Sequence, residues 1–273
     1  MEIAGTCIVV TGGASGIGRA LAERFAAAGA RGVVVADLNE EWAVKVAERI
    51  GGLGVGCDVG DPAQVASLVA TAESAYGPVD VFCSNAGYTD PPDSELSAPP
   101  EDWRRIVDVN LLAHVWAAQA VVPSMLARGS GYLLQTISSA ALITGPSPAG
   151  YTLTKHGALG FAEWLTLNYG HRGVRVSCLC PNAVYTGMFG RALDDDSSRP
   201  PDNSAIGEIL MPDEVAATVI EAMAGDERFL ILPHPRVAES FLRKATDYDR
   251  WLDGTRRRLL RMREAAADAG EGQ

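Results

Sequence analysis

The chain contains few of the residues that usually hold metals. It has five cysteines and four histidines in 273 residues. Cys178 and Cys180 alternate along one predicted strand, and no histidine or cysteine follows them at the spacing of a zinc finger. Cys7, Cys57 and Cys83 also fall within predicted strands, where a free cysteine behaves as a small core residue. We therefore expect no metal site.

Long apolar runs and positive charge are also scarce. No uninterrupted apolar stretch approaches the ~20 residues that span a membrane, and no basic leader precedes the first predicted strand. The chain has 34 Asp and Glu against 23 Lys and Arg, a net charge of −11, which disfavours nucleic acid or an anionic membrane as the main partner. The basic run 256–258 with Arg261 and Arg263 is the exception, and a solvated helix face or a contact between subunits explains it better than a nucleic-acid site. We expect a soluble, cytoplasmic protein.

Apolar strand patterns alternate with helical patterns through most of the chain. The expected strands are 6–11, 32–36, 53–57, 79–83, 131–137, 174–179 and 229–232. The expected helices are 16–28, 40–50, 62–76, 101–127, 151–169 and 212–224. This alternation predicts an α/β fold, a doubly wound sheet of about seven parallel strands with helices on both faces. At 47% hydrophobic the chain can bury one core, so we expect a single domain over 1–273.

A glycine-rich turn joins the first predicted strand to the first helix. It reads Thr11-Gly-Gly-Ala-Ser-Gly-Ile-Gly18, and such a turn lets the backbone approach a pyrophosphate whose charge meets the N–H groups at the helix start. The next strand ends at Asp37, about 20 residues further on, where a carboxylate accepts hydrogen bonds from a ribose diol. Together they predict a dinucleotide site at the carboxyl ends of the strands.

A tyrosine and a lysine stand four residues apart at the start of the helix 151–169. On a helix, Tyr151 and Lys155 share a face, so the ammonium lies near the phenol and favours its ionised form. A phenol of lowered pKa can exchange a proton with an alcohol. Ser138 lies thirteen residues before the tyrosine. Taken alone, a Tyr and a Lys at this spacing are ordinarily a surface pair.

Together these motifs resemble the short-chain dehydrogenase/reductase family over about residues 6–186. The family's TGxxxGxG motif is met by Thr11, Gly12, Gly16 and Gly18, and its YxxxK motif by Tyr151 and Lys155; its NNAG motif appears at 84–87 with serine first. The resemblance implies a catalytic set of Asn110, Ser138, Tyr151 and Lys155. It implies cofactor contacts from Gly12, Ser15, Gly16, Ile17, Gly18, Asp37, Leu38, Asp58, Val59, Asn85, Ala86, Gly87, Tyr151, Lys155, Pro181, Val184 and Thr186.

In the roles that the resemblance implies, Tyr151 exchanges the hydroxyl proton and Ser138 binds the substrate oxygen. Lys155 lowers the pKa of the tyrosine and holds the nicotinamide ribose, and Asn110 positions a water. Some of these residues have ordinary explanations as well. Asp58 without the family is equally a solvated turn residue, and Ser139 is a second candidate for the catalytic hydroxyl.

The chain departs from the family pattern near its C-terminus. Asn182 stands where Gly usually follows Pro181, which bears on how closely the backbone approaches the nicotinamide. The familiar glycine-rich ending is replaced by the segment 229–235 and by an atypical charged helix expected over 236–265. His114, His171 and His234 have no evident partners, and His156 points away from Lys155 around its helix.

The sequence therefore predicts an oxidoreductase, an NAD-dependent alcohol dehydrogenase or carbonyl reductase. NAD is favoured over NADP because Asp37 would repel a 2′-phosphate and no cation stands at Ser15, Leu38 or Asn39. The alternatives are an NADPH-dependent ketoreductase and a non-catalytic dinucleotide-binding sensor module.

The expected substrate is a bulky, apolar secondary alcohol or ketone. Apolar residues follow Ser138 at 140–143 and follow Pro181 at 183–185. The segment 187–210 fits a flap over the substrate better than a disordered surface loop. Apolar residues on more than one side of helices 101–127 and 151–169 predict a homo-oligomer, a dimer or a tetramer.

Overall fold

The computed structural model describes residues 1–89, 96–189, 207–225 and 228–270. In this part of the chain seven parallel strands form one sheet in the order β3-β2-β1-β4-β5-β6-β7. The strands are β1 (Cys7–Thr11), β2 (Gly32–Asp37), β3 (Leu53–Gly56), β4 (Val81–Ser84), β5 (Gly131–Thr136), β6 (Val174–Leu179) and β7 (Leu230–Ile231). The strand order reverses between β1 and β4, which opens a crevice at the carboxyl ends of the strands.

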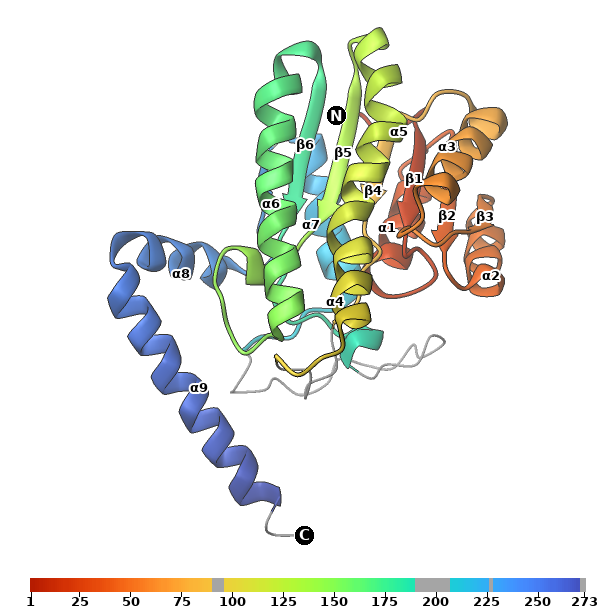
Figure 1. Cartoon of the computed structure of the whole chain (residues 1–273). Coiled ribbons are helices and arrows are strands. Elements are labelled where there is room, and N and C mark those ends of the chain that lie inside the picture. The colour runs from red at the N-terminus through yellow and green to blue at the C-terminus, as the bar shows by residue number, and fades with distance from the viewer. Residues whose placement is uncertain (90–95, 190–206, 226–227, 271–273) are drawn as a thin grey trace.

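Helices cover both faces of this sheet (Figure 1). One face packs against α1 (Gly16–Ala27), α2 (Glu40–Ile50) and α7 (Pro212–Ala224), and the other against α3 (Pro62–Tyr76), α5 (Ala113–Arg128) and α6 (Ala149–Tyr169). Successive side chains of β1 point to opposite faces of the sheet, so Val9 lies in one apolar core and Ile8 in the other. The Rossmann-type doubly wound fold expected from the sequence is confirmed.

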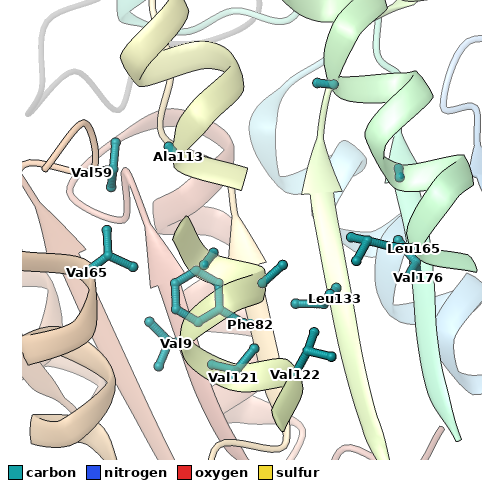
Figure 2. Close-up of a cluster of buried hydrophobic side chains, with 14 of the residues drawn as sticks. Val9, Val59, Val65, Phe82, Ala113, Val121, Val122, Leu133, Leu165 and Val176 are labelled. Carbon is teal, nitrogen blue, oxygen red and sulfur yellow. The ribbon is translucent and has the colours of Figure 1, made fainter. Parts of the chain in front are cut away.

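The core beneath α3, α5 and α6 is built from interlocking aliphatic and aromatic side chains (Figure 2). Phe82 of β4 lies among Val9 and Val121, and all three are 1% exposed or less. Burying a side chain of this size contributes roughly 1.5–3 kcal/mol. This core holds β4 and β5 rigidly, and the functional loops begin where these two strands end.

The helix expected over 101–127 is interrupted. It consists of α4 (Pro100–Val107), one π-helical turn (Asp108–Leu112) and α5. The π-turn contains Asn110, whose side chain is tied to the backbone of Tyr88, and such bulges gather at functional sites. By length and composition the whole helix Pro100–Arg128 could cross a membrane, but half of its most apolar window is buried in the protein. It is the core helix of this fold.

The C-terminal segment differs from the single helix expected over 236–265. Two helices, α8 (Pro235–Thr246) and α9 (Tyr248–Gly270), are separated by Asp247, whose backbone is extended. The Asp247 carboxylate accepts a hydrogen bond of 3.0 Å from the Arg250 N–H, and this cap starts α9 in a new direction. In Figure 1, α9 projects away from the sheet.

Smaller differences concern strand ends and the expected flap. The strand expected over 79–83 is shifted to Val81–Ser84, and the one expected over 229–232 is shortened to Leu230–Ile231. Asp80, just before β4, accepts a hydrogen bond from the Cys7 N–H through its side chain. Of the flap expected over 187–210, residues 190–206 lie outside the described part of the chain. The segment begins with a short 3₁₀ helix, Gly187–Phe189, and Leu210 pairs with Val184 in an isolated β-bridge.

Candidate active site

The glycine turn after β1 is shaped for close backbone approach. Gly12 has φ +62°, and a Cβ there would lie 2.8 Å from the Cα of Ala86; a Cβ on Gly18 would lie 2.1 Å from the Gly12 carbonyl oxygen. Neither position tolerates a side chain. Ser15, the N-cap of α1, makes no side-chain cap bond, so the N–H groups of the first turn remain available to an anion. The turn therefore fits the pyrophosphate of a dinucleotide.

Asn85 and Thr11 lock this turn to the end of β4. The Asn85 amide donates to the Thr11 carbonyl over 3.0 Å, and the N–H groups of Asn85 and Ala86 both donate to the Thr11 hydroxyl. The side chain of Asn85 is thus occupied in holding the loop. Its contribution to a cofactor site is to fix the position of the Ala86-Gly87 backbone.

Asp37 stands at the opposite end of the crevice from Tyr151. Its carboxylate accepts hydrogen bonds from the N–H of Ala14 over 3.1 Å and from the N–H of Asn39 over 3.0 Å. These bonds orient the carboxylate beside the glycine turn. Leu38, which follows it, is 71% exposed.

Asp58 pairs with an arginine that the sequence patterns did not single out. Arg105 of α4 donates to the Asp58 carboxylate over 3.0 Å, and the Gly60 N–H donates to it over 2.9 Å. Burial alone would raise the pKa of Asp58, but the bonds from Arg105 and Gly60 hold that pKa below its ordinary value. No spacing signal marks Arg105, since the two residues come from separate elements.

The two adjacent serines after β5 take different partners. Ser138 hydrogen-bonds the phenol of Tyr151, and its hydroxyl accepts a bond of 3.1 Å from the Ala140 N–H. Ser139 turns away, and its hydroxyl donates to the Asn182 side chain over 3.3 Å. The structure therefore places Ser138, and not Ser139, at the tyrosine.

The expected lowering of the Tyr151 pKa is corrected by the structure. Burial raises the pKa of Tyr151, and the opposing influence is the hydrogen bond from Ser138. The Lys155 ammonium lies 5.4 Å from the centre of the phenol ring. The physical reason is that Tyr151 is only partly exposed to water, and the loss of water around a phenol disfavours its charged form.

Lys155 is almost completely enclosed, at 3% exposed. Its ammonium donates to the Thr136 carbonyl over 3.3 Å, and burial lowers the pKa of Lys155 to about 8. A Cβ on Gly87 would approach this ammonium to 3.5 Å, so the glycine leaves room beside it. The lysine is thus held at the end of β5, facing the backbone of the Ala86-Gly87 loop.

Asn110 supports the same region from the π-turn. Its amide donates to the Tyr88 carbonyl over 2.7 Å and its carbonyl accepts from the Tyr88 N–H over 3.0 Å. The side chain is fully buried and used in these two bonds. Asn110 therefore fixes the loop after Gly87.

The predicted residues meet in a cleft of about 660 Å³ along the carboxyl edge of the sheet, a volume within the usual range for small-ligand sites. Gly18 and Asn110 lie behind its wall. The predicted residues that line it are Gly12, Ser15, Gly16, Ile17, Asp37, Leu38, Asp58, Val59, Asn85, Ala86, Gly87, Ser138, Tyr151, Lys155, Pro181, Val184 and Thr186. The lining residues that the motifs did not mark include Tyr88, Thr89, Arg105, Ile137, Asn182 and Met188.

The apolar residues expected to form the substrate pocket are placed differently. Ala140, Ala141 and Leu142 are at most 4% exposed and Ala183 is 5% exposed, so they lie in the protein interior instead of the cleft wall. The turn at Ser139–Ala141 directs these side chains inward. Val184 and Met188 remain on the wall.

The histidines also need one correction. His234 has two partners, because its ring contacts the N–H of Asn182 and the carbonyl of Ala183, each over 3.1 Å. His156 is turned back to the Thr152 carbonyl of its own helix. His114 is buried without a hydrogen-bond partner among the described residues, and burial lowers the pKa of His114 to about 3.

Among the described residues, no group of three or more His, Cys, Asp or Glu side chains could hold a metal ion. All five cysteines are free and buried. Cys57 lines the cleft, and burial raises the pKa of Cys57 to about 11, so this thiol is not ionised at neutral pH.

The site defines a dinucleotide-dependent oxidoreductase, and comparisons with known proteins specify the family. Residues 6–197 match the short chain dehydrogenase family. A 1-deoxy-11-beta-hydroxypentalenate dehydrogenase of Streptomyces exfoliatus is 38% identical over 84% of this chain and 84% of its own length. The mitochondrial borneol dehydrogenase of Lavandula x intermedia is 32% identical over 85% of this chain and 88% of its own length.

A solved structure agrees with this assignment. A short-chain dehydrogenase/reductase from Burkholderia phymatum in complex with NAD superposes with a TM-score of 0.80 at 28% identity, covering 91% of this chain and 96% of that one. The chain belongs to the short-chain dehydrogenase/reductase family. It is an oxidoreductase with a nicotinamide dinucleotide cofactor, in a family whose dehydrogenases include enzymes acting on cyclic alcohols.

Proposed function

We propose that this protein is an NAD-dependent dehydrogenase of bulky, largely apolar secondary alcohols, and a carbonyl reductase in reverse. The observation that carries the proposal is the Ser138–Tyr151 hydrogen bond at one end of the cleft, with Asp37 at the other end. One cofactor laid along the cleft spans both. The chain therefore has a group for proton transfer and a group for cofactor choice in a single site.

The chemistry divides between cofactor and chain. Bound NAD supplies a hydride acceptor at its nicotinamide ring. Tyr151 takes the hydroxyl proton during oxidation and returns it to the carbonyl oxygen during reduction, and Ser138 hydrogen-bonds that oxygen. Burial keeps the phenol of Tyr151 protonated at neutral pH by raising its pKa, which suits the reducing direction, while the Ser138 bond favours the phenolate needed for oxidation.

Lys155 and Asn110 act behind these two groups. The Lys155 ammonium faces the Ala86-Gly87 backbone and binds the hydroxyls of the nicotinamide ribose, and Asn110 keeps the Gly87-Tyr88 backbone in place. A protein that only binds a dinucleotide has no need of a serine hydrogen-bonded to a tyrosine beside this lysine. The Ser138–Tyr151 pair therefore favours the enzyme over a non-catalytic sensor module. The two hypotheses separate in one assay, because a sensor binds NADH without any turnover.

The preference for NAD over NADP follows from Asp37. Its carboxylate is fixed beside the glycine turn by Ala14 and Asn39, so a 2′-phosphate placed there meets a like charge. Such a contact costs several kcal/mol, or more than about 100-fold in affinity. Arg19, which directly follows the glycine turn, forms an ion pair of 2.8 Å with Glu23.

The cofactor assignment is tested by kcat/KM for both cofactors in the wild type and in Asp37→Ser/Leu38→Arg. We expect the wild type to prefer NAD and the double variant to shift the ratio toward NADP by about 100-fold. Leu252→Arg, which makes the same Leu-to-Arg change on α9 and adds one positive charge there, is the control. A wild type that prefers NADP would establish the NADPH-dependent ketoreductase instead.

The apolar substrate is supported by what lines the described part of the cleft. Tyr88, Ile137, Val184 and Met188 contribute to its wall. The one arginine among these lining residues, Arg105, is already paired with Asp58. An anionic substrate would therefore lack an unpaired arginine, and the relative named for borneol, an uncharged and bulky alcohol, points the same way.

The substrate class is tested by following NADH fluorescence with a panel of alcohols. The panel contains terpenoid, steroid, cyclic, aryl and aliphatic secondary alcohols, a short polyol and a sugar phosphate. We expect the bulky apolar alcohols to have the highest kcat/KM. If the polyol or the sugar phosphate has the highest kcat/KM, the proposal of an apolar substrate is wrong.

We further propose a single domain that works as a cytoplasmic homo-oligomer. The support is the exposed apolar face of α6, where Leu153 is 53%, Trp164 50% and Leu167 81% exposed. Contiguous exposed apolar side chains of this size usually mark a protein interface.

A further inference from the structure

The segment after β7 replaces the glycine-rich ending that the family resemblance leads one to expect. It brings His234, the N-cap of α8, against the loop that follows β6. This loop, residues 180–186, includes Pro181, Asn182 and Val184, which line the cleft on the side of Tyr151. His234 itself is outside the cleft and 4% exposed.

The ring of His234 spans two neighbouring peptide groups of the loop. Nδ1 lies 3.1 Å from the Asn182 nitrogen and Nε2 lies 3.1 Å from the Ala183 carbonyl oxygen. A backbone N–H can only donate and a carbonyl can only accept. The ring is therefore neutral, with its proton on Nε2, and both of its nitrogens are used. Burial lowers the pKa of His234, which favours this neutral form.

The same loop is held from its other side. The Ser139 N–H donates to the Pro181 carbonyl over 2.8 Å, and the Ser139 hydroxyl donates to the Asn182 side chain over 3.3 Å. The Leu210 N–H also donates to the Ala183 carbonyl, over 3.1 Å. Asn182 is thus fixed between Ser139, the neighbour of the catalytic serine, and His234. Removal of the histidine takes away the acceptor of the Asn182 N–H.

The far end of α8 has a second buried anchor. Lys244 is 6% exposed, and its ammonium donates to the Leu142 carbonyl over 2.9 Å. It also lies 5.4 Å from the ring centre of Tyr248 and 5.2 Å from that of Trp251. Helix α8 is therefore pinned at its start to the loop after β6 and at its end to the loop after Ser138.

We propose that His234 is a positioning residue for the nicotinamide end of the cofactor site, and that it acts by fixing the Asn182-Ala183 backbone. The inference rests on the proposed function in one respect, namely that loop 180–186 meets the nicotinamide. Asn182, where the family usually has glycine, is then tolerated because His234 and Ser139 define its conformation. Its backbone needs no left-handed conformation, since no residue other than glycine has positive φ in the described chain.

The test compares the binding of NAD with that of ADP-ribose, which lacks the nicotinamide ring. His234→Phe keeps an aromatic ring in the buried space and removes both hydrogen bonds. We expect it to weaken NAD binding about tenfold, equivalent to about 1.4 kcal/mol, and to leave ADP-ribose binding unchanged. Isothermal titration calorimetry measures both affinities without any turnover.

Two variants and one control complete the experiment. His234→Gln carries an acceptor and a donor about as far apart as the ring nitrogens and should restore most of the NAD affinity. His234→Asn is one methylene shorter, reaches Asn182 but not Ala183, and should have an intermediate NAD affinity. If the Phe variant does not fold, the Gln and Asn variants test the role of His234. His171→Phe, at an exposed histidine in the turn Gly170–Arg172, is the matched control and should change neither affinity.

The outcomes separate this inference from the proposed function. Equal losses for NAD and ADP-ribose, or no loss for either, would overturn the role of His234. If the wild type binds ADP-ribose and NAD with the same affinity, the nicotinamide makes no contact and the premise about the loop fails. Absence of turnover in a wild type that binds NAD normally would overturn the dehydrogenase and leave His234 untouched.

Discussion

At the scale of single residues, Tyr151 and Lys155 show how burial changes the chemistry of a motif. Helical spacing alone suggests that the lysine charge lowers the pKa of the phenol. In the folded protein burial raises the pKa of Tyr151, and Ser138 supplies the opposing hydrogen bond. The serine is therefore an electrostatic partner of the tyrosine, in addition to the role that we propose for it at the substrate oxygen.

Removal of the phenolic hydroxyl isolates the proton transfer. We expect Tyr151→Phe to lower kcat by at least about 100-fold and to leave NAD affinity nearly unchanged, because it removes one proton donor and little packing. Steady-state rates and calorimetric NAD binding measure the two effects. Tyr169→Phe, on the same helix outside the cleft, is the control. If Tyr151→Phe retains more than about a tenth of wild-type kcat, the general base has been misassigned.

The buried charge of Lys155 lowers the stability of the folded protein. Its pKa falls to about 8 in the folded protein from 10.5 in the unfolded chain. The folded state therefore gives up its proton more readily, so the wild type gains stability as pH rises from about 8 to 10.5. Below about pH 8 the penalty for the buried charge is present in full.

We expect Lys155→Met to raise the free energy of unfolding at pH 7 by about 1–3 kcal/mol while abolishing turnover. The gain should shrink as pH approaches 10.5. Urea unfolding at pH 7 and at pH 10 measures both values. Lys45→Met, at a lysine whose side chain is 46% exposed, should change stability little at either pH. A Lys155→Met variant less stable than the wild type at pH 7 would show that the bond to Thr136 outweighs desolvation.

At the scale of elements, α6 has two functions on two faces. Its inner face carries Tyr151 and Lys155 into the cleft, and its outer face exposes Leu153, Trp164 and Leu167. Gly160 on that outer face borders open space, which allows a second helix to approach closely. A helix that carries catalytic groups gains rigidity from such a partner.

We expect Trp164→Glu/Leu167→Glu to dissociate the oligomer, because it places four buried charges in a symmetric interface of two copies. Light scattering at micromolar concentration measures the mass. Leu242→Glu/Leu252→Glu, at exposed leucines of α8 and α9, is the matched control and should leave the mass unchanged. A wild type that is already monomeric would refute the interface on α6.

At the scale of the whole molecule, the doubly wound sheet assembles one cleft from distant parts of the chain. Gly12, Asp37, Asn85, Ser138 and Pro181 each end or follow a different parallel strand, and parallel strands end at one edge. The cleft mouth also includes Met188, which is 47% exposed. An apolar ligand that covers this side chain gains from its burial.

We expect Met188→Ala to raise KM for a bulky apolar alcohol about fivefold, as the loss of about 1 kcal/mol of apolar contact implies, with NAD affinity unchanged. Initial rates with terpenoid alcohols measure this effect. Met125→Leu, at a buried methionine of α5, is a control for the loss of a thioether. An equal rise in KM for a short alcohol would show that Met188 stabilises the loop and does not contact the substrate.

The sequence by itself determined the fold and most of the cleft. Strand and helix periods predicted the doubly wound sheet, which is confirmed, because β-branched runs and amphipathic helices each have a local signature. The glycine turn and Asp37 also had local signatures, a glycine-rich spacing after the first strand and an acidic residue at the end of the second.

The tertiary structure alone decided how these groups act on one another. Arg105 meets Asp58, and His234 meets Asn182, across separations that no periodicity encodes. The apolar residues 140–142 point into the core because a single turn redirects them. The pKa of Tyr151 is raised, where the helical spacing predicted a lowered value, because burial disfavours the phenolate. Desolvation depends on everything that surrounds a side chain, and those neighbours come from every part of the chain.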